Sequence, residues 1–388
     1  MRLAISRTLA FKIAAIALST ALCLVIAEFV LRTLSPVQVV IFPEGLIAPS
    51  ADPAVCYELN PRWPEHDRDG LRVSGPQTGK GPHGKKILVT GDSIAYGLGV
   101  GPGQTISTTM GRILKGCGLT EDWEVLNMGV PGHGIGQICA RLENKGAKYE
   151  ADYLAYIYCL NDIFDDAGQA GNFLIANNDK LILPEQMLET KYIDMLLRLQ
   201  MAQRGVLLYR KLKYGNAVKT GVQPDFTYLK NRTDDTALKI INGFLSRQYK
   251  HHYVGVNWGN AEHSYYSDYY NKLYYLLKLN AGLSGIGRFC RKSKISPYIF
   301  IVPIFTPDKT DSYVFAHIHG LITALSRHHG LYVKDLQPVL SAHPSSLVSQ
   351  KDYSHPSAYG NEVIAREVLE AMGFSRCLAG NRMKPTGA

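Results

Sequence analysis

Short apolar runs alternate with polar loops and helix-like stretches from residue 85 onward. Each run is rich in β-branched or aromatic residues, and a polar or glycine-rich loop follows it; the runs lie at 86–90, 124–128, 152–159, 297–303 and 331–335. Such runs predict short buried strands, and their alternation with helices predicts parallel βαβ units. We therefore expect an α/β fold, a three-layer αβα sandwich around a five-stranded parallel sheet.

The N-terminal region carries one longer apolar stretch, from Leu9 to Leu31. Lys12 and Glu28 interrupt it only near its ends, so roughly 20 residues can span a bilayer. Arg2 and Arg7 precede it, which places the N-terminus in the cytoplasm. A cleaved signal peptide is the alternative, but no small-x-small site stands in a suitable place. We expect an uncleaved signal anchor in the cytoplasmic (inner) membrane, with the remaining chain outside the cytoplasm, in the periplasm.

These patterns divide the chain into parts. We expect the anchor at 1–35, an extended Pro- and Gly-rich leader at 36–84, the α/β domain at 85–375 and a tail at 376–388. An insertion at about 166–295 is too long for a plain loop, so it should have its own structure. Within it, 184–213 reads as a helix with one apolar face. Core packing is the favoured role of that face, and a lid or membrane-surface helix is the alternative.

The insertion also holds a tyrosine-rich stretch, Ser264 to Leu279. Its tyrosines are Tyr265, Tyr266, Tyr269, Tyr270, Tyr274 and Tyr275. We favour a helix packed on the domain with its hydroxyls reaching water. An aromatic wall for a sugar or an acyl chain is the alternative.

Three candidate site residues follow predicted strands. Ser93 follows the first, where a helix would begin and free backbone N–H groups favour negative charge. Gly129 and Asn161 follow the next two strands. Ligands bind beyond the carboxyl ends of strands in open parallel sheets, so these residues should meet at one edge. Each alone is also an ordinary cap or turn residue.

Near the C-terminus, His355 supplies a base and Asp352 lies three residues before it. The imidazole would take the proton of the Ser93 hydroxyl, and the carboxylate would hold its tautomer. The backbone N–H groups of Ser93 and Gly129, with the Asn161 amide, would bind the oxyanion that forms. The Gly-x-Ser-x-Gly elbow of α/β-hydrolases is absent, which argues against that fold.

The blocks that carry these residues, in this order, resemble the SGNH or GDSL-type hydrolases. They are Gly91-Asp92-Ser93, Asn127-Met128-Gly129, Asn161-Asp162 and Asp352-Tyr353-Ser354-His355-Pro356. The resemblance spans about 52–373 and implies a flavodoxin-like fold in a membrane-anchored, extracytoplasmic member. It implies a serine esterase with Ser93, Gly129, Asn161 and His355 in the four named positions. Cys159 stands where that family usually has glycine.

Net charge and cysteine content indicate which surroundings and which ligands the chain is suited to. The formal net charge is +9, scattered along the chain. This suits anionic surroundings such as lipid headgroups or acidic glycans, and no nucleic-acid motif appears. Of seven cysteines, Cys23 lies in the apolar segment, and the other six could pair in an oxidising compartment in about fifteen ways. No cysteine or histidine spacing fits a metal, and we predict no metal and no cofactor.

The function that these features predict is hydrolysis of an ester, with O-acyl or O-acetyl groups of envelope glycans favoured over lipid. An O-acyltransferase that uses the same triad is one alternative. A non-catalytic glycan-binding or scaffold protein is another, and Cys159 in place of glycine is its best support. Neither the ester nor the oligomeric state is set by the sequence.

Overall fold

The structure is a computed structural model of the 388-residue chain. It describes residues 7–34, 39–43, 45–73, 84–163, 167–170, 173–176, 181–184, 199–205, 208, 219–220, 226–247, 269–305, 313–350 and 355–379. The chain forms two compact units. Unit 1 comprises Met1–Glu44 and Gly168–Lys219, and unit 2 comprises Gly45–Ala167 and Thr220–Ala388.

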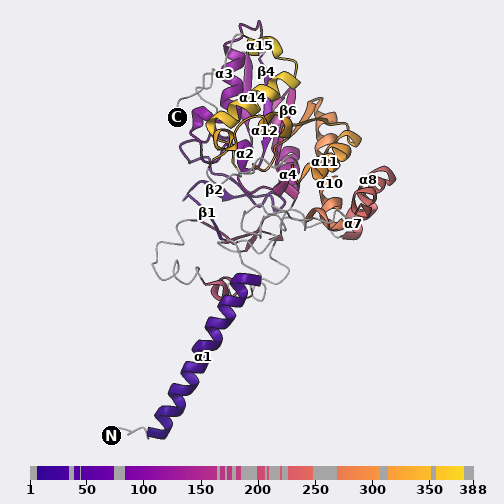
Figure 1. Ribbon diagram of the computed structural model, residues 1–388. Helices are drawn as coiled ribbons and strands as arrows, with labels where there is room; N and C mark the ends of the chain where they lie inside the picture. Colours follow the sequence, from indigo (N-terminus) through magenta and orange to yellow (C-terminus); the bar gives the residue numbers. More distant parts are fainter. Residues whose placement is uncertain are drawn as a thin grey trace. The chain divides into compact units, whose positions relative to one another are not determined.

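Unit 1 contains the long N-terminal helix α1, Arg7–Leu34 (Figure 1). Its stretch Phe11–Thr33 has a mean hydropathy of 2.4, and none of the residues in this stretch is buried. It is long and apolar enough to cross a membrane, because 23 residues of helix measure about 34 Å at 1.5 Å per residue. A signal sequence near an N-terminus has the same properties.

A five-stranded sheet in the order β1-β9-β8-β7-β10 joins the segment after α1 to the insertion. Its strands are β1 (Val39–Phe42), β7 (Ala167–Ala170), β8 (Phe173–Ala176), β9 (Leu181–Pro184) and β10 (Lys219–Thr220). β1 pairs with β9 in parallel, Val39 opposite Leu181, and β8 pairs with β9 antiparallel. The first half of the insertion therefore folds with the anchor segment.

Unit 2 contains the predicted parallel sheet, in the order β12-β11-β6-β4-β5. The strands are β4 (Lys85–Gly91), β5 (Trp123–Asn127), β6 (Tyr153–Tyr158), β11 (Ser296–Ile301) and β12 (Tyr332–Asp335). All five predicted strands are confirmed to within two residues at each end. All four pairings are parallel, and in chain order the strands lie 2-1-3-4-5, the flavodoxin-like arrangement.

Helices cover both faces of this sheet, as Figure 1 shows. α3 (Ile106–Lys115) connects β4 to β5 and packs with α14 (Ala358–Ala371). α4 (Ile135–Lys145), α10 (Leu273–Ser293) and α11 (Ala316–His328) belong to connections that run the other way across the sheet, and they pack together. Right-handed crossovers put connections of opposite direction on opposite faces, which gives the three-layer αβα sandwich.

Shorter elements complete unit 2. The helices are α2 (Ser93–Tyr96), η1 (Pro102–Gln104), η2 (Gly146–Tyr149), η3 (Leu160–Ile163), α7 (Phe226–Asn231), α8 (Asp235–Ser246), α12 (Gln337–Ser341), α13 (Ser345–Val348) and α15 (Ser375–Ala379). A small antiparallel pair joins β2 (Ile47–Pro49) and β3 (Tyr57–Leu59). α7 and α8 lie in the second half of the insertion and pack on α10.

Residues 45–73, expected to be part of an extended leader, pack into unit 2. Tyr57 is fully buried and its hydroxyl donates to the Pro131 carbonyl at 2.7 Å. The Gln137 amide donates to the Val55 carbonyl at 2.8 Å. These bonds explain the packing of a segment without helical or strand periodicity, because its Tyr57 hydroxyl and its Val55 carbonyl both find buried partners in the rest of unit 2.

The tyrosine-rich stretch is helical only in part, since α10 begins at Leu273, and residues 264–268 lie outside the described ranges. Tyr270 is buried, and its hydroxyl bonds to the Tyr158 hydroxyl at 2.7 Å and donates to the Leu160 carbonyl at 3.1 Å. This ring therefore packs in the core, as the favoured prediction has it, but its hydroxyl bonds to protein rather than to water. Of the helix predicted over 184–213, the described part includes a helical turn at 200–205.

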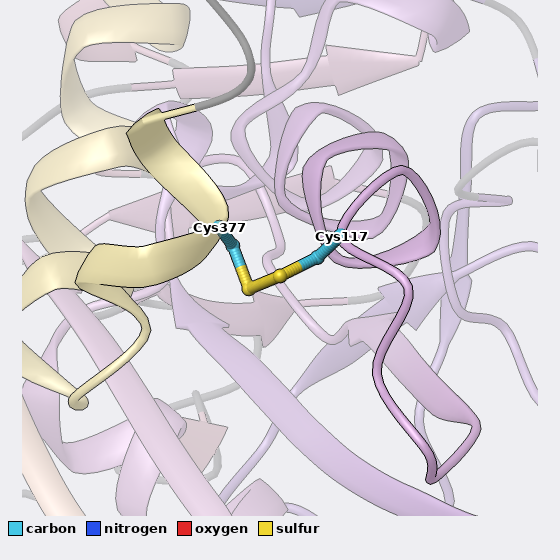
Figure 2. The surroundings of a disulfide bond; sticks show 2 residues. All are labelled: Cys117 and Cys377. Atoms are coloured by element: carbon cyan, nitrogen blue, oxygen red, sulfur yellow. A yellow bond between two sulfur atoms is a disulfide. The ribbon is translucent and has the colours of Figure 1, made fainter.

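One disulfide joins Cys117, after α3, to Cys377 in α15, 260 residues apart in sequence (Figure 2). It fastens the last described helix to the face that α3 and α14 cover. Disulfides persist in oxidising compartments.

Reduction of this disulfide, or the double change Cys117→Ser with Cys377→Ser, should lower the free energy of unfolding by about 2–4 kcal/mol, because the open chain gains entropy. Urea unfolding of the full chain in detergent measures it. Cys23→Ser, on the exposed face of α1, is the control. An unchanged midpoint for the double variant would show that the disulfide carries no stability.

Candidate active site

Ser93 is the first residue of α2, directly after β4. Gly91 ends that strand with φ +147°, and a Cβ there would lie 2.5 Å from the Ile157 carbonyl oxygen, so only glycine fits. Asp92 then caps the helix, because its Oδ1 accepts from the Ile94 N–H at 2.9 Å. The strand-to-helix turn thus holds the Ser93 hydroxyl beyond the carboxyl end of the sheet.

His355 lies against this hydroxyl. Its Nε2 is 2.9 Å from Ser93 Oγ, although 262 residues separate the two in sequence. The Ser93 hydroxyl also lies 3.3 Å from Asp92 Oδ2. A hydroxyl has one hydrogen to donate, so the imidazole and the carboxylate are rival acceptors, and the imidazole is closer.

The loop that carries His355 is tied to the serine turn by Gln350. The Gln350 side-chain amide donates to the Leu98 carbonyl at 2.7 Å and to the Pro356 carbonyl at 3.0 Å. Its backbone N–H donates to the His355 carbonyl at 2.8 Å. One glutamine thereby fixes the spacing of the two loops. Asp352, predicted to orient the imidazole, lies outside the described residues.

Asn161 joins the same cluster through Asp92. Its side-chain Nδ2 donates to Asp92 Oδ2 at 2.9 Å, and Asp92 is fully buried. Asn161 lies in η3, immediately after β6, as the strand pattern predicts. Asp92 therefore accepts hydrogen bonds from the serine turn and from the asparagine loop, which holds the two loops in register.

Gly129 lies close to this turn, but its N–H is already hydrogen-bonded. It donates to Asn127 Oδ1 at 3.0 Å. A Cβ at Gly129 would lie 2.3 Å from the Tyr96 backbone nitrogen, so the close approach of this loop to α2 requires glycine. The packing alone accounts for a glycine at this position.

Cys159, in place of the glycine that the resemblance implies, causes no backbone distortion. Among the described non-glycine residues, positive φ occurs at Cys56, Glu150 and Lys294, so Cys159 has an ordinary conformation. The following turn is stabilised by Asp162, whose Oδ2 accepts from the Tyr156 hydroxyl at 2.7 Å. Burial, and the Asp162 carboxylate, hold the pKa of the Tyr156 hydroxyl well above its ordinary value.

Two buried arginines, Arg72 and Arg141, hold the loops of the site, a role that the sequence pattern did not predict for either. The Arg72 guanidinium donates to the carbonyls of Tyr96 and Gly97, at the end of α2. The Arg141 guanidinium donates to the carbonyls of Met128 and Gly70. An isolated arginine reads as a surface charge. Only the folded structure shows that both guanidinium groups donate hydrogen bonds to backbone carbonyls of the site loops.

His133, in the loop after β5, is buried, and its Nε2 lies 2.9 Å from the Tyr57 carbonyl oxygen, which fixes the N–H on that nitrogen. Burial, reinforced by the nearby Arg141 charge, lowers the pKa of this imidazole from 6.5 to about 3.

Because the unfolded chain binds this proton more tightly, the free energy of unfolding should fall as pH decreases from about 6.5 towards 3. His133→Gln should flatten the pH dependence of the urea midpoint in that window. His343→Gln, at a partly exposed histidine beside the Tyr359 hydroxyl, is the control. Equal slopes for His133→Gln and the parent chain would contradict the assignment.

Metal ligands in proteins are mostly His, Cys, Asp and Glu side chains, and the described ranges of the chain contain all four types. No cluster there brings three His, Cys, Asp or Glu side chains together. The adjacent pair His328 and His329 instead bonds to Asp234 at 2.8 Å and to Asn280 at 2.7 Å.

Comparison with known proteins gives a structural likeness only. No protein-family model matches the chain, and no curated protein matches it. An alpha/beta hydrolase enzyme from the metagenome of Lake Arreo, Spain, is 14% identical over 75% of this chain and 96% of its own, with a TM-score of 0.39.

Two other similar structures are esterases. A catalytic mutant of the acetylxylan esterase Axe2 from Geobacillus stearothermophilus is 13% identical over 78% of this chain and 98% of its own, with a TM-score of 0.38. The esterase EstA from a Pseudoalteromonas species is 11% identical over 76% of this chain and 100% of its own, with a TM-score of 0.37. Similarity at this level assigns neither a family nor a substrate to this chain.

Proposed function

We propose that this chain is a membrane-anchored serine esterase of the SGNH type. The observation that carries the proposal is the 2.9 Å distance between Ser93 Oγ and His355 Nε2 at the carboxyl edge of the parallel sheet. A serine hydroxyl becomes nucleophilic when a base within hydrogen-bond reach takes its proton. Asp352, three residues before His355, is proposed to hold the imidazole tautomer.

The reaction runs in two halves. His355 takes the Ser93 proton while Oγ attacks the ester carbonyl, and the alcohol leaves with that proton as the acyl-enzyme forms. Water then loses a proton to His355, attacks the acyl group and releases the acid and the free Ser93 hydroxyl.

The oxyanion of each tetrahedral intermediate would be held by the Ser93 backbone N–H, the Gly129 N–H and the Asn161 side-chain amide. Asn161 is oriented for this by Asp92, which accepts one of its hydrogen bonds. The Gly129 N–H donates to Asn127 Oδ1, so its use on an oxyanion requires that bond to be shared or exchanged.

O-acyl or O-acetyl groups on envelope glycans are the proposed substrate. The net charge of +9 favours anionic surroundings, and the disulfide and α1 favour an extracytoplasmic site. Because Arg7 and Lys12 lie at the start of α1, that end should face the cytoplasm. A reporter fused after Ala388 that is active only in the cytoplasm would contradict this orientation.

The test of the activity uses the full chain in detergent. We expect it to hydrolyse a short-chain aryl acetate, and we expect a fluorophosphonate probe to modify Ser93, located by peptide mass spectrometry. Release of acetate without an added sugar acceptor supports a hydrolase, whereas acetate transfer that requires the acceptor supports an O-acyltransferase. Absence of both turnover and labelling in the folded protein would favour a non-catalytic binding protein.

A further inference from the structure

The anchor helix carries an acidic side chain inside its apolar stretch. Glu28 lies five residues before the end of Phe11–Thr33, which is about 7–8 Å along the helix axis. A carboxylate at such a depth in a bilayer is costly unless hydrogen bonds and an opposite charge compensate it.

Glu28 has both the hydrogen bonds and the opposite charge, and two of the hydrogen bonds come from the insertion. The backbone N–H of Gln200 donates to Glu28 Oε1 at 2.8 Å, and that of Met201 donates to Oε2 at 3.0 Å. Arg32 Nε donates to Oε1 at 2.8 Å. Glu28 thus caps the start of the helical turn 200–205, where free N–H groups attract a carboxylate.

The contact covers one stripe of α1. Between residues 11 and 33, the half-buried positions are Ala27, Glu28 and Leu31, and the others are exposed. Residues three and four apart share one helix face, so a single face of α1 is covered.

The helical turn 200–205, which Glu28 caps, buries amide side chains while a neighbouring apolar side chain is exposed. This is the reverse of the pattern expected for a helix in water. Gln200 and Gln203 are buried, with exposed fractions of 7% and 4%. Leu199, the residue just before this turn, is 38% exposed. A surface helix in water buries its apolar side chains and exposes its amides. Apolar side chains that face outward beside a membrane-spanning helix are suited to acyl chains and headgroups.

We propose that residues 199–205 form an interfacial helix, held against α1 by Glu28, whose outward face binds the phospholipid bilayer. This rests on the proposed anchoring of α1, because Glu28 ties the interfacial helix to the depth of α1 itself. The bilayer covers Leu199, and the half-buried Glu28 carboxylate lies between the two helices.

The experiment measures bilayer exposure with a nitroxide at single cysteines of the full chain in phosphatidylcholine–phosphatidylglycerol vesicles. Cys23→Ser and Cys139→Ser remove the free cysteines that are not buried. The probe sites are L199C, L18C and L119C. Leu119 is the matched control, since it is also a leucine and is 39% exposed, but lies in unit 2. Collision with oxygen reports lipid, and collision with a water-soluble nickel chelate reports water.

We expect a severalfold higher oxygen-to-nickel ratio at 199 than at 119, and the highest ratio at 18. Glu28→Ala should lower the ratio at 199 to that at 119 and leave 18 unchanged. Thr33→Ala is the control variant, because the Thr33 hydroxyl bonds to carbonyls of its own helix.

Three outcomes would overturn the proposal. Equal ratios at 199 and 119, with 18 in lipid, would refute the interfacial helix alone. A low ratio at 18 would refute the anchoring and the interfacial helix together. A ratio at 199 that is unchanged by Glu28→Ala would refute Glu28 as the group that holds the helix.

Discussion

Ser93→Ala should lower ester turnover by about 10⁴–10⁶, to the level that binding and oxyanion donors alone sustain. His355→Ala should cost nearly as much, and the double variant hardly more than either, because the hydroxyl needs the imidazole to lose its proton. The 2.9 Å contact between the two groups is the reason to treat them as one unit. Steady-state hydrolysis of an aryl acetate by all three variants measures the non-additivity.

Both side chains lie at the site and not in the core, so the variants should remain folded. Circular dichroism and the thermal midpoint check this. Ser341→Ala, an exposed serine at the end of α12, is the matched control. Turnover at the parental rate by folded Ser93→Ala would end the serine-esterase proposal.

Asn161→Ala should lower kcat by about 10²–10³, because one oxyanion donor is typically worth that much. Proton transfer does not pass through Asn161, so the fluorophosphonate probe should still label Ser93, but more slowly. Asp92→Asn should also lower kcat, since one carboxamide oxygen cannot accept from both Asn161 and Ile94 as the two carboxylate oxygens do.

Asn242→Ala, at an exposed position of α8, is the control for Asn161→Ala. If Asn161→Ala leaves kcat within about twofold of the parent, Asn161 is a turn residue and not an oxyanion donor. A loss of labelling as complete as that of Ser93→Ala would instead place Asn161 in the nucleophile unit.

The strands of unit 2 could be predicted because buried parallel strands are nearly continuous apolar runs with polar loops at their ends. The same rule placed Ser93 and Asn161 at one edge of the sheet, and Asp92 links them there. Residues 45–73 could not be predicted, because their packing depends on side chains such as Arg141 that are far away in sequence.

The contacts of Gln350 and Arg72 could not be predicted from the sequence either. Each binds backbone carbonyls of a loop distant in sequence, and such bonds follow from the folded backbone and leave no periodic signal. The sequence allows about fifteen ways to pair all six cysteines outside the apolar segment, whereas a single pair, Cys117 and Cys377, is joined and the other four are free, which the residue types do not specify. The hydrogen bond of the Gly129 N–H to Asn127 likewise depends on local geometry that residue types do not specify.

The pairing of β1 with β9 has a consequence for how the chain emerges from the ribosome. Val39 precedes its partner Leu181 by 142 positions, so an apolar strand stays unpaired during synthesis until the insertion follows. Strand pairings between residues far apart in sequence form late in folding, and an unpaired strand edge can pair with other chains and aggregate. A shortened gene that begins at codon 45 would delete β1 and leave β9 with an open edge. Purification strategies should therefore retain the first 44 residues and use detergent rather than truncation.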